Sequence, residues 1–203
     1  MPFTKPQKEV LTSNARFRVL ISGRRFGKTF LAINELAKFA RFPNQKVWYV
    51  SPSYRQSKNI CWAMLKDQII KHKWAKKIND SDLSIILKNN SIIQLKGADN
   101  EQSLRGVGLN FIVLDEFADI KPQAWYEVLR PTLSDTGGHA LFCGSPKGFN
   151  FAYDLYTRQD PEWKSFKYTT IEGEQVSAEE IEQAKNDLDE RTFQQEYLAT
   201  FVN

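Results

Sequence analysis

The chain has 203 residues, of which 41% are hydrophobic and 26% charged, and its net charge is +4. This length and balance indicate one folded domain of ordinary size and exclude a disordered polypeptide. No apolar run reaches the roughly 18 residues of a membrane-spanning helix, and the N-terminus lacks the pattern of a secretory signal. The two cysteines, Cys61 and Cys143, predict neither a zinc site nor a disulfide framework, which favours a reducing, cytoplasmic setting.

Short apolar runs alternate with amphipathic segments along the chain. Strands are predicted at 17–21, 46–51, 111–116 and 139–145, with an edge strand at 163–170. Helices are predicted at 29–41, 54–73 and 177–197, and a β-hairpin at 83–97 around two consecutive asparagines. The last helix opens with Ser177 and Glu180 in a capping-box pattern. Unbroken apolar strands separated by helices predict an α/β fold with a mainly parallel central sheet, helices on both faces and the hairpin as an insertion.

Residues 21–30, with the sequence ISGRRFGKTF, join a predicted strand to a predicted helix through a glycine-bearing loop. A phosphate-binding P-loop requires this order of elements, because backbone N–H groups and the helix N-terminus attract phosphate. Gly27 lets the backbone approach the β-phosphate, Lys28 reaches the β- and γ-oxygens, and Thr29 offers a hydroxyl to Mg²⁺. Ser22 replaces the first glycine of the strict pattern, so a chance match at a strand–helix turn is the alternative.

The sequence FIVLDE, residues 111–116, ends an apolar strand in two acids, as a Walker B segment does. Ligands bind outside the carboxyl ends of parallel strands, so these acids are expected near the P-loop. Asp115 is expected to hold Mg²⁺ directly or through water, and Glu116 to polarise the attacking water as general base. Acids at strand ends are often only turn residues, but the combination with a P-loop favours catalysis.

Two further residues belong to the same hypothesis. Ser145, in LFCGSPKG after another strand, is placed to sense the γ-phosphate or the attacking water, with an ordinary Ser-Pro turn as the alternative. Arg105, in the glycine-flanked SLRGVG, is placed to neutralise charge that develops in phosphoryl transfer, in its own subunit or a neighbouring one. A surface arginine without such a role is the alternative.

Basic residues cluster in the middle of the chain, whereas acids dominate from Glu172 to Glu196. The basic cluster comprises Arg55, Lys58, Lys66, Lys71, Lys73, Lys76 and Lys77. Such a stretch is able to bind a phosphate backbone, because each neutralised phosphate releases counterions. A solvated helix face is an equally good interpretation of the charge alone.

Taken together, these motifs resemble the N-terminal ATPase domain of the large terminase subunit, the DNA-packaging motor of tailed bacteriophages. The likeness covers nearly the whole chain and rests on SGRRFGKT, WYVSPSYRQSK, GADNEQSLRG, VLDEFADI, CGSPKG and FQQEYLATF. It implies a P-loop NTPase of the ASCE (RecA-like) type that hydrolyses ATP with Mg²⁺ and drives double-stranded DNA into a procapsid. The variant loop, with Ser22 followed by arginines, is typical of that family and does not count against activity.

The resemblance also assigns roles residue by residue. It implies that Glu116, Arg105 and Arg24 are catalytic, with Arg24 contacting phosphate and Arg105 acting as a finger on the adjacent subunit. Gln7 matches the glutamine that recognises adenine, and Thr29 and Asp115 match the magnesium ligands. The remaining nucleotide-binding residues implied are Ser22, Gly23, Arg24, Arg25, Phe26, Gly27, Lys28 and Ser145.

The resemblance further implies the partners and the surroundings of the domain. We expect residues 1–175 to form the ATPase core and residues 176–203 a helical segment that leads towards a nuclease domain. Since the chain stops at Asn203, before such a domain, we expect ATP hydrolysis without DNA cleavage. The expected partners are double-stranded DNA, a homo-oligomeric ring (a pentamer) on the portal, the small terminase subunit and the nuclease domain of the full-length protein, but no membrane. The expected location is the host cell cytoplasm, at the procapsid portal vertex.

Two other functions remain open at this point. A helicase-like DNA translocase shares both Walker motifs, but it usually needs a second RecA-like domain to complete its site. A non-catalytic nucleotide-binding assembly module would use ATP only to order an interface. Glu116 argues against that module, because a pure binder has no need of a catalytic acid.

Overall fold

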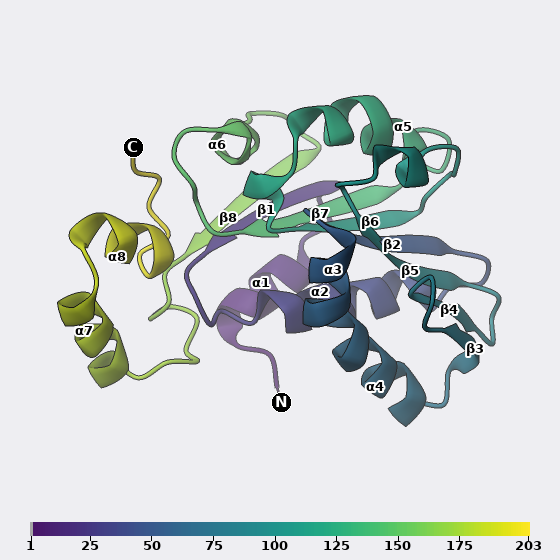
Figure 1. Cartoon of the computed structure of the whole chain (residues 1–203), viewed down its shortest axis with the longest axis horizontal. Helices are drawn as coiled ribbons and strands as arrows, with labels where there is room; N and C mark the ends of the chain where they lie inside the picture. The colour runs from purple at the N-terminus through teal and green to yellow at the C-terminus, as the bar shows by residue number, and fades with distance from the viewer. Residues whose placement is uncertain (1) are drawn as a thin grey trace. The chain divides into compact units, whose positions relative to one another are not determined.

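The computed structural model describes residues 2–203 and contains an eight-stranded sheet with the order β3-β4-β5-β2-β6-β7-β1-β8 (Figure 1). The pairs β1–β8, β2–β5 and β2–β6 are parallel, whereas β3–β4 and β4–β5 are antiparallel. This confirms the predicted α/β class with a mainly parallel sheet. The strands are β1 Phe17–Ser22, β2 Lys46–Ser51, β3 Ala75–Asn79, β4 Ser84–Leu87, β5 Ile92–Gly97, β6 Phe111–Asp115, β7 His139–Gly144 and β8 Trp163–Tyr168.

The helical segments alternate with the strands along the chain. The α-helices are α1 Lys5–Thr12, α2 Lys28–Ala40, α3 Tyr54–Ser57, α4 Ala63–Lys71, α5 Arg130–Thr132, α6 Phe151–Tyr156, α7 Ala178–Asp187 and α8 Glu190–Glu196. Lys58–Trp62 and Ala124–Leu129 are π-helical, and Glu101–Leu104 and Phe117–Asp119 are 3₁₀ turns. Within residues 2–203, no helix is long and apolar enough to cross a membrane.

The chain forms two compact units, which are described separately. Unit 1 contains the residues up to Leu31, Glu116–Ala118 and Leu141–Asn203, and unit 2 contains Ala32–Asp115 and Asp119–Ala140. The residues expected in the site are therefore distributed over both units.

The core of unit 1 is built on β1, whose six residues are all buried, including the polar Arg18 and Ser22. β1 pairs with β8 in parallel, and the ring of Phe17 stacks on that of Trp163 with centroids 4.7 Å apart. β8 is the last strand in the sheet order, and of its residues only Phe166 is buried. The predicted edge strand is thus confirmed.

Unit 2 is built on β2, which lies between β5 and β6 and is parallel to both. All of its residues except Lys46 are buried. The ring of Phe39 in α2 stacks on that of Phe111 in β6 with centroids 4.0 Å apart, which packs the helix onto the sheet. β6 is buried along its whole length and ends at Asp115, so the unit delivers this carboxylate from a rigid strand.

The predicted hairpin is confirmed and extended by one strand. β4 and β5 pair antiparallel, and Asn90 in their connecting turn has a φ of 69°. β3 adds to β4, with an irregular register between Ala75 and Lys77, and Figure 1 shows β3, β4 and β5 next to one another in unit 2. The sequence of β3, AKKIN, gives no apolar alternation, and for this reason the strand is missing from the predicted elements.

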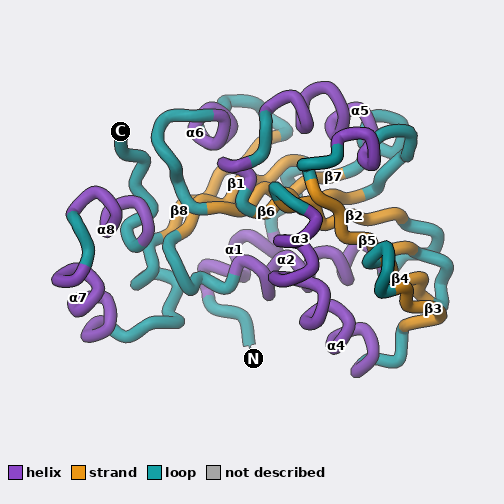
Figure 2. Tube along the Cα trace, in the orientation of Figure 1, coloured by secondary structure: helices purple, strands orange, loops and turns teal. Residues whose placement is uncertain are grey.

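Two predicted helices differ from the structure. The helix expected at 54–73 has a π-helical middle and ends at Lys71, and the tail expected as one helix is broken in two (Figure 2). Ser177 accepts from the backbone N–H of Glu180 at 3.3 Å, but Leu188 and Asp189 are extended. Asp189 starts α8 as an N-cap by accepting from the N–H of Thr192 at 2.9 Å, and this local hydrogen bond competes with a continuous helix.

The sequence analysis missed α1 entirely. Thr4 and Gln7 form a capping box at its start, and Pro6 lies in its first turn. Both features are helix-start signals that are visible in the sequence TKPQ. The helix positions Gln7, whose side chain is part of the site described next.

Candidate functional site

The loop between β1 and α2 bends through left-handed backbone conformations. Arg25 has a φ of 62° and Gly27 a φ of 87°. A Cβ at position 27 would lie 2.7 Å from Nε2 of Gln7, so this position needs glycine for its conformation and for its space. The Nζ of Lys28, the first residue of α2, contacts the backbone oxygens of Ser22 and Gly23 at 3.4 and 3.3 Å. The loop thus wraps around an ammonium group at a helix N-terminus.

Ser22, the residue that departs from the strict P-loop pattern, is fully buried. Its hydroxyl has no hydrogen-bond partner within residues 2–203, and its carbonyl accepts from Oγ of Ser145 at 3.3 Å. A buried hydroxyl without a partner costs free energy, and a ligand bound in the loop would supply the missing partner. The turn after β7, which carries Ser145, is in direct contact with the end of β1.

Gln7 lies under the loop, with 3% of its surface exposed. Its Oε1 accepts from the N–H of Thr4 at 3.0 Å, and its Nε2 donates to the carbonyl of Phe26 at 2.9 Å. The ring of Phe26 is buried and stacks on Tyr168 at 5.4 Å. One end of the Gln7 amide therefore bonds to the start of α1 and the other end bonds to the loop.

The C-terminal segment binds the outer side of the loop. The N–H of Arg24 donates to the carbonyl of Glu196 at 2.7 Å, and Nε of Arg24 donates to Oε2 of Glu196 at 2.9 Å. The N–H of Thr170 donates to the carbonyl of Tyr197, and its hydroxyl donates to the carbonyl of Arg24. The hydrogen bond and charge of Glu196 raise the pKa of Arg24, with smaller contributions from Tyr197 and Glu116.

Two cavities adjoin the arginines of the expected site. Arg24 and Arg25 line one of about 460 Å³ in unit 1, which Gln175, Ser177, Glu180 and Tyr197 complete. Arg105 lines another of about 400 Å³ in unit 2, together with Gly106, Glu127 and Asp135. Arg105 itself is exposed and follows the 3₁₀ turn that ends at Leu104. Arg24 and Arg25 thus line a cavity of unit 1, whereas Arg105 lines a different cavity, in unit 2.

Asp115, at the end of β6, is 3% exposed. Its Oδ2 accepts a hydrogen bond of 2.5 Å from the hydroxyl of Tyr49, which is fully buried in β2. Burial, followed by the charge of Asp115, raises the pKa of the Cys61 thiol. A carboxylate held in this way has a fixed direction, which suits a metal ligand.

Glu116 follows Asp115 directly but belongs to unit 1, and its φ of 49° is left-handed. This conformation costs about 1 kcal/mol or more for a residue with a Cβ, and such backbone strain clusters at functional sites. The next residue, Phe117, is buried and packs edge-on against Phe142 and Phe151. The packing of Phe117 anchors the chain just past Glu116 and supports the strained conformation.

The structure thus groups most of the predicted residues, but not all of them. Unit 1 holds Gln7, the loop from Ser22 to Thr29, Glu116 and Ser145, whereas unit 2 holds Arg105 and Asp115. Sequence reasoning missed Tyr49 and Glu196. Both lie in stretches quoted for the family resemblance, but nothing local points to their partners, because Tyr49 is 66 residues from Asp115 and Glu196 is 172 residues from Arg24.

The family model for the terminase large subunit, T4likevirus-type, N-terminal, matches residues 19–203. The chain belongs to this family. It is 33% identical over 193 residues to the terminase large subunit of Escherichia phage T5, a match that covers 92% of the chain and 44% of that relative. The chain thus spans less than half the length of that curated relative.

Solved structures of the family have the same fold. The large terminase ATPase domain of Thermus phage P74-26 superposes with a TM-score of 0.88 at 25% identity, covering 100% of this chain and 94% of that one. A large terminase from another thermophilic bacteriophage, solved in complex with ADP, gives a TM-score of 0.81 at 18% identity, covering 99% of this chain and 54% of that one. At that identity, the second likeness concerns the fold alone.

Proposed function

We propose that this chain is the ATP-hydrolysing motor domain of a terminase large subunit. The observation that carries the proposal is the loop around Lys28 in the same unit as Glu116, whose backbone is held in a left-handed conformation. Its structural relative from phage P74-26, at 25% identity, is named an ATPase domain. Membership of the terminase family favours a motor over a helicase-like translocase.

The loop binds the phosphates of ATP. Lys28 turns its ammonium group from the carbonyls of Ser22 and Gly23, which it contacts at 3.4 and 3.3 Å, to the β- and γ-oxygens. The hydroxyl of Ser22 gains the partner that it lacks among the described residues. Gln7 holds the loop through its hydrogen bond to the carbonyl of Phe26. Its amide still has one N–H and one oxygen lone pair without a hydrogen bond within residues 2–203, and with these it contacts the adenine base.

Thr29 and Asp115 supply a hydroxyl and a carboxylate, the oxygen donors that Mg²⁺ prefers. Mg²⁺ is commonly held by one or two carboxylates together with substrate phosphates and water, so the chemistry of each donor, Thr29 of unit 1 and Asp115 of unit 2, suits the ion. Thr29 and Asp115 are the residues that would hold Mg²⁺, and the bound ion would supply positive charge against the charge that develops on the phosphates. The buried position of Asp115 at the end of β6 keeps its carboxylate out of bulk solvent.

Glu116 acts as the general base. Its carboxylate accepts a proton from water as the water oxygen bonds to the γ-phosphorus. The bond from that phosphorus to the bridging oxygen breaks, and ADP leaves with the electron pair. The hydroxyl of Ser145 donates to the carbonyl of Ser22 at 3.3 Å. Through this contact, loss of the γ-phosphate changes the conformation of the turn after β7, which carries Ser145.

Arg24 acts in the site of its own subunit, whereas Arg105 acts in the site of a neighbouring subunit. Arg24 contacts phosphate from within the loop, and to do so its guanidinium leaves Glu196, which it contacts at 2.9 Å. Arg105 is exposed in unit 2 and serves the site of a neighbouring subunit in the ring. An arginine supplied in trans stabilises the charge of the transition state only when subunits assemble.

The motor assembles as a homo-oligomeric ring, a pentamer, on the procapsid portal in the host cytoplasm. Its other partners are double-stranded DNA, the small terminase subunit and the nuclease domain of the full-length protein. Of the basic cluster, Lys66 pairs with Asp80 at 2.7 Å, whereas exposed lysines at the end of α4 and in β3 have no ion pair within residues 2–203. These exposed lysines near the end of α4 and in β3 are Lys71, Lys73, Lys76 and Lys77.

The deciding experiment compares the wild-type chain with Glu116→Gln. ATP affinity and steady-state hydrolysis are measured with Mg²⁺, over a range of protein concentrations, with and without long duplex DNA. Glutamine keeps the shape but cannot take the proton, so turnover should fall roughly 10²- to 10⁴-fold while ATP affinity stays within about twofold. Tight ATP binding with no turnover in any wild-type condition would favour the assembly module, and unchanged turnover in the variant would remove Glu116 as the base.

A further inference from the structure

The Walker B aspartate has a dedicated hydrogen-bond donor in unit 2. The hydroxyl of Tyr49 lies 2.5 Å from Oδ2 of Asp115, and both side chains are buried, at 0% and 3% exposure. A hydrogen bond to an ionised carboxylate is shorter and stronger than one between neutral groups. The hydroxyl therefore holds one carboxylate oxygen of Asp115 within the buried interior of unit 2.

Strand register explains how the tyrosine reaches the aspartate. Tyr49 of β2 is paired with Val113 of β6 in the parallel ladder, and Asp115 lies two residues beyond Val113. Residues two apart on a strand share a face, and two residues advance about 6.6 Å along the strand. Side chains on a strand also lean along its direction, so a ring the length of tyrosine spans this advance. A shorter hydroxyl residue such as serine would not reach.

We infer that Tyr49 is a positioning residue for the Mg²⁺-dependent reaction: its hydroxyl fixes the carboxylate of Asp115 for the metal. The inference rests on the proposed function, because it concerns the same site. Groups that donate a hydrogen bond to a metal-binding carboxylate without touching the metal strengthen metal binding. Mutating such a donor typically lowers metal affinity or activity 10- to 100-fold. Tyr49 acts through Asp115 and does not itself touch ATP.

The neighbouring Cys61 thiol is uncharged. The Cys61 thiol is buried in unit 2, and its pKa is raised by burial and by the charge of Asp115, so it stays neutral. The ring of Tyr49 is part of the core between β5 and β6 and is retained in a phenylalanine variant. Tyr49→Phe therefore removes the hydroxyl that orients Asp115 and little else.

The test measures how the dependence on metal changes in Tyr49→Phe. We expect the Mg²⁺ concentration for half-maximal ATP hydrolysis to rise at least tenfold. Binding of ATP-γ-S should weaken by a similar factor with Mg²⁺ present, and stay within about twofold in EDTA. The affinity of Mn²⁺ for the nucleotide complex, followed by electron paramagnetic resonance, should fall in parallel, which gives a readout independent of turnover.

A matched control is available in the same unit. Tyr54→Phe also removes a tyrosine hydroxyl with one hydrogen bond, here to the carbonyl of Ser81 at 2.7 Å, and leaves Asp115 untouched. This control should show wild-type metal dependence. A melting temperature lowered in Tyr49→Phe without any change in Mg²⁺ or Mn²⁺ affinity would assign Tyr49 a purely structural role and overturn the inference.

Failure of the inference is distinguishable from failure of the proposed function. Absence of hydrolysis in the wild-type chain under all conditions contradicts the proposed function. The Mn²⁺ titration of the ATP-γ-S complex does not need turnover, so it still tests Tyr49 in that case. Equal Mn²⁺ affinities of the wild-type chain and Tyr49→Phe contradict the inference alone.

Discussion

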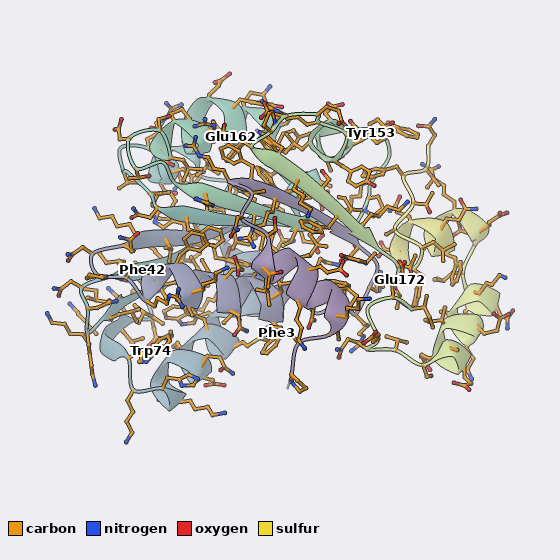
Figure 3. The ribbon with its side chains drawn as sticks, turned by 180° about the vertical axis from the view of Figure 1, so that it is seen from behind. Phe3, Phe42, Trp74, Tyr153, Glu162 and Glu172 are labelled. Carbon is orange, nitrogen blue, oxygen red and sulfur yellow. The ribbon has the colours of Figure 1, made fainter. Side chains whose placement is uncertain are left out.

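The phosphate loop and the exposed cations of unit 2 carry the same charge but differ in what surrounds them. In the loop, Arg24 is bound to Glu196 and Lys28 to two carbonyls of its own turn. In unit 2, Arg105 and the lysines at the end of α4 and in β3 face solvent. Figure 3 shows Trp74, which separates α4 from β3, at the same end of unit 2 as Phe42, the second residue after α2.

This difference separates two kinds of residue. The conformation of the loop is determined by contacts inside unit 1, so its substitutions change a property of the isolated chain. The exposed cations make no ion pair among the described residues, so their effects should appear only when a second subunit or DNA is added.

The largest effect is expected from Arg105→Ala. An arginine finger is worth roughly 10³-fold or more in turnover, so hydrolysis by the assembled protein should fall by about that factor while ATP affinity is unchanged. Turnover is measured against protein concentration, with Arg55→Ala, another exposed arginine of unit 2, as the matched control.

Mixing two inactive variants sharpens this test. Arg105→Ala keeps Glu116 in its own site, and Glu116→Gln keeps Arg105 for its neighbour. If Arg105 acts in trans, the mixture should recover part of the activity that neither variant has alone. A mixture as inactive as its components would show that Arg105 does not serve the neighbouring subunit.

A smaller effect, on folding, is expected from Gly23→Ala. The added Cβ would lie 2.8 Å from both the backbone nitrogen of Thr170 and the carbonyl oxygen of Tyr197, and neither atom is free to rotate away. Overpacking of this kind costs about 3 kcal/mol, which is roughly 6–12 °C in melting temperature for a chain of this size.

Thermal unfolding of the isolated chain measures the effect of Gly23→Ala. Gly108→Ala is the control, because its nearest neighbour is a side-chain carbon 3.7 Å away and the change should be nearly neutral. Equal melting temperatures for the two variants would show that the C-terminal segment does not hold the loop as tightly as its hydrogen bonds indicate.

Much of the loop was predictable from the sequence because its signals are local. The mainly apolar run FRVLI predicted β1, and GKT after a glycine-bearing turn predicted the start of α2. Ser22 illustrates the limit of such a pattern. It departs from the strict motif, yet it is fully buried at the end of β1, next to Ser145 and Lys28.

The contacts that complete the site were not predictable, for a physical reason. Glu196 reaches Arg24 only after the chain has passed through β8 and α7, and Tyr49 reaches Asp115 only through the register of β2 with β6. Both depend on the tertiary arrangement within a unit and have no local signal. The missed α1 is different, because its capping box was readable in the sequence.

The smallest effect is expected from replacing the four exposed lysines near the end of α4 and in β3 by alanine together. If these lysines contact DNA phosphates, affinity for long duplex should fall on the order of tenfold at low salt. The slope of log affinity against log salt should also become shallower, by roughly 0.9 for each phosphate that is no longer neutralised. The variant is Lys71→Ala, Lys73→Ala, Lys76→Ala and Lys77→Ala in one chain.

A control with the same change in net charge separates a DNA-binding face from general electrostatics. Four exposed lysines of unit 1, Lys5, Lys8, Lys164 and Lys167, are replaced by alanine in one chain. The loss of four charges is identical, so a long-range effect would weaken DNA binding equally in both variants, whereas direct phosphate contacts would weaken it only in the unit 2 variant. Low-salt DNA binding that is unchanged in the unit 2 variant would remove the end of α4 and β3 from the DNA-contacting surface. The four lysines would then contribute to solubility, and Lys71 would in addition interact favourably with the helix dipole at the end of α4.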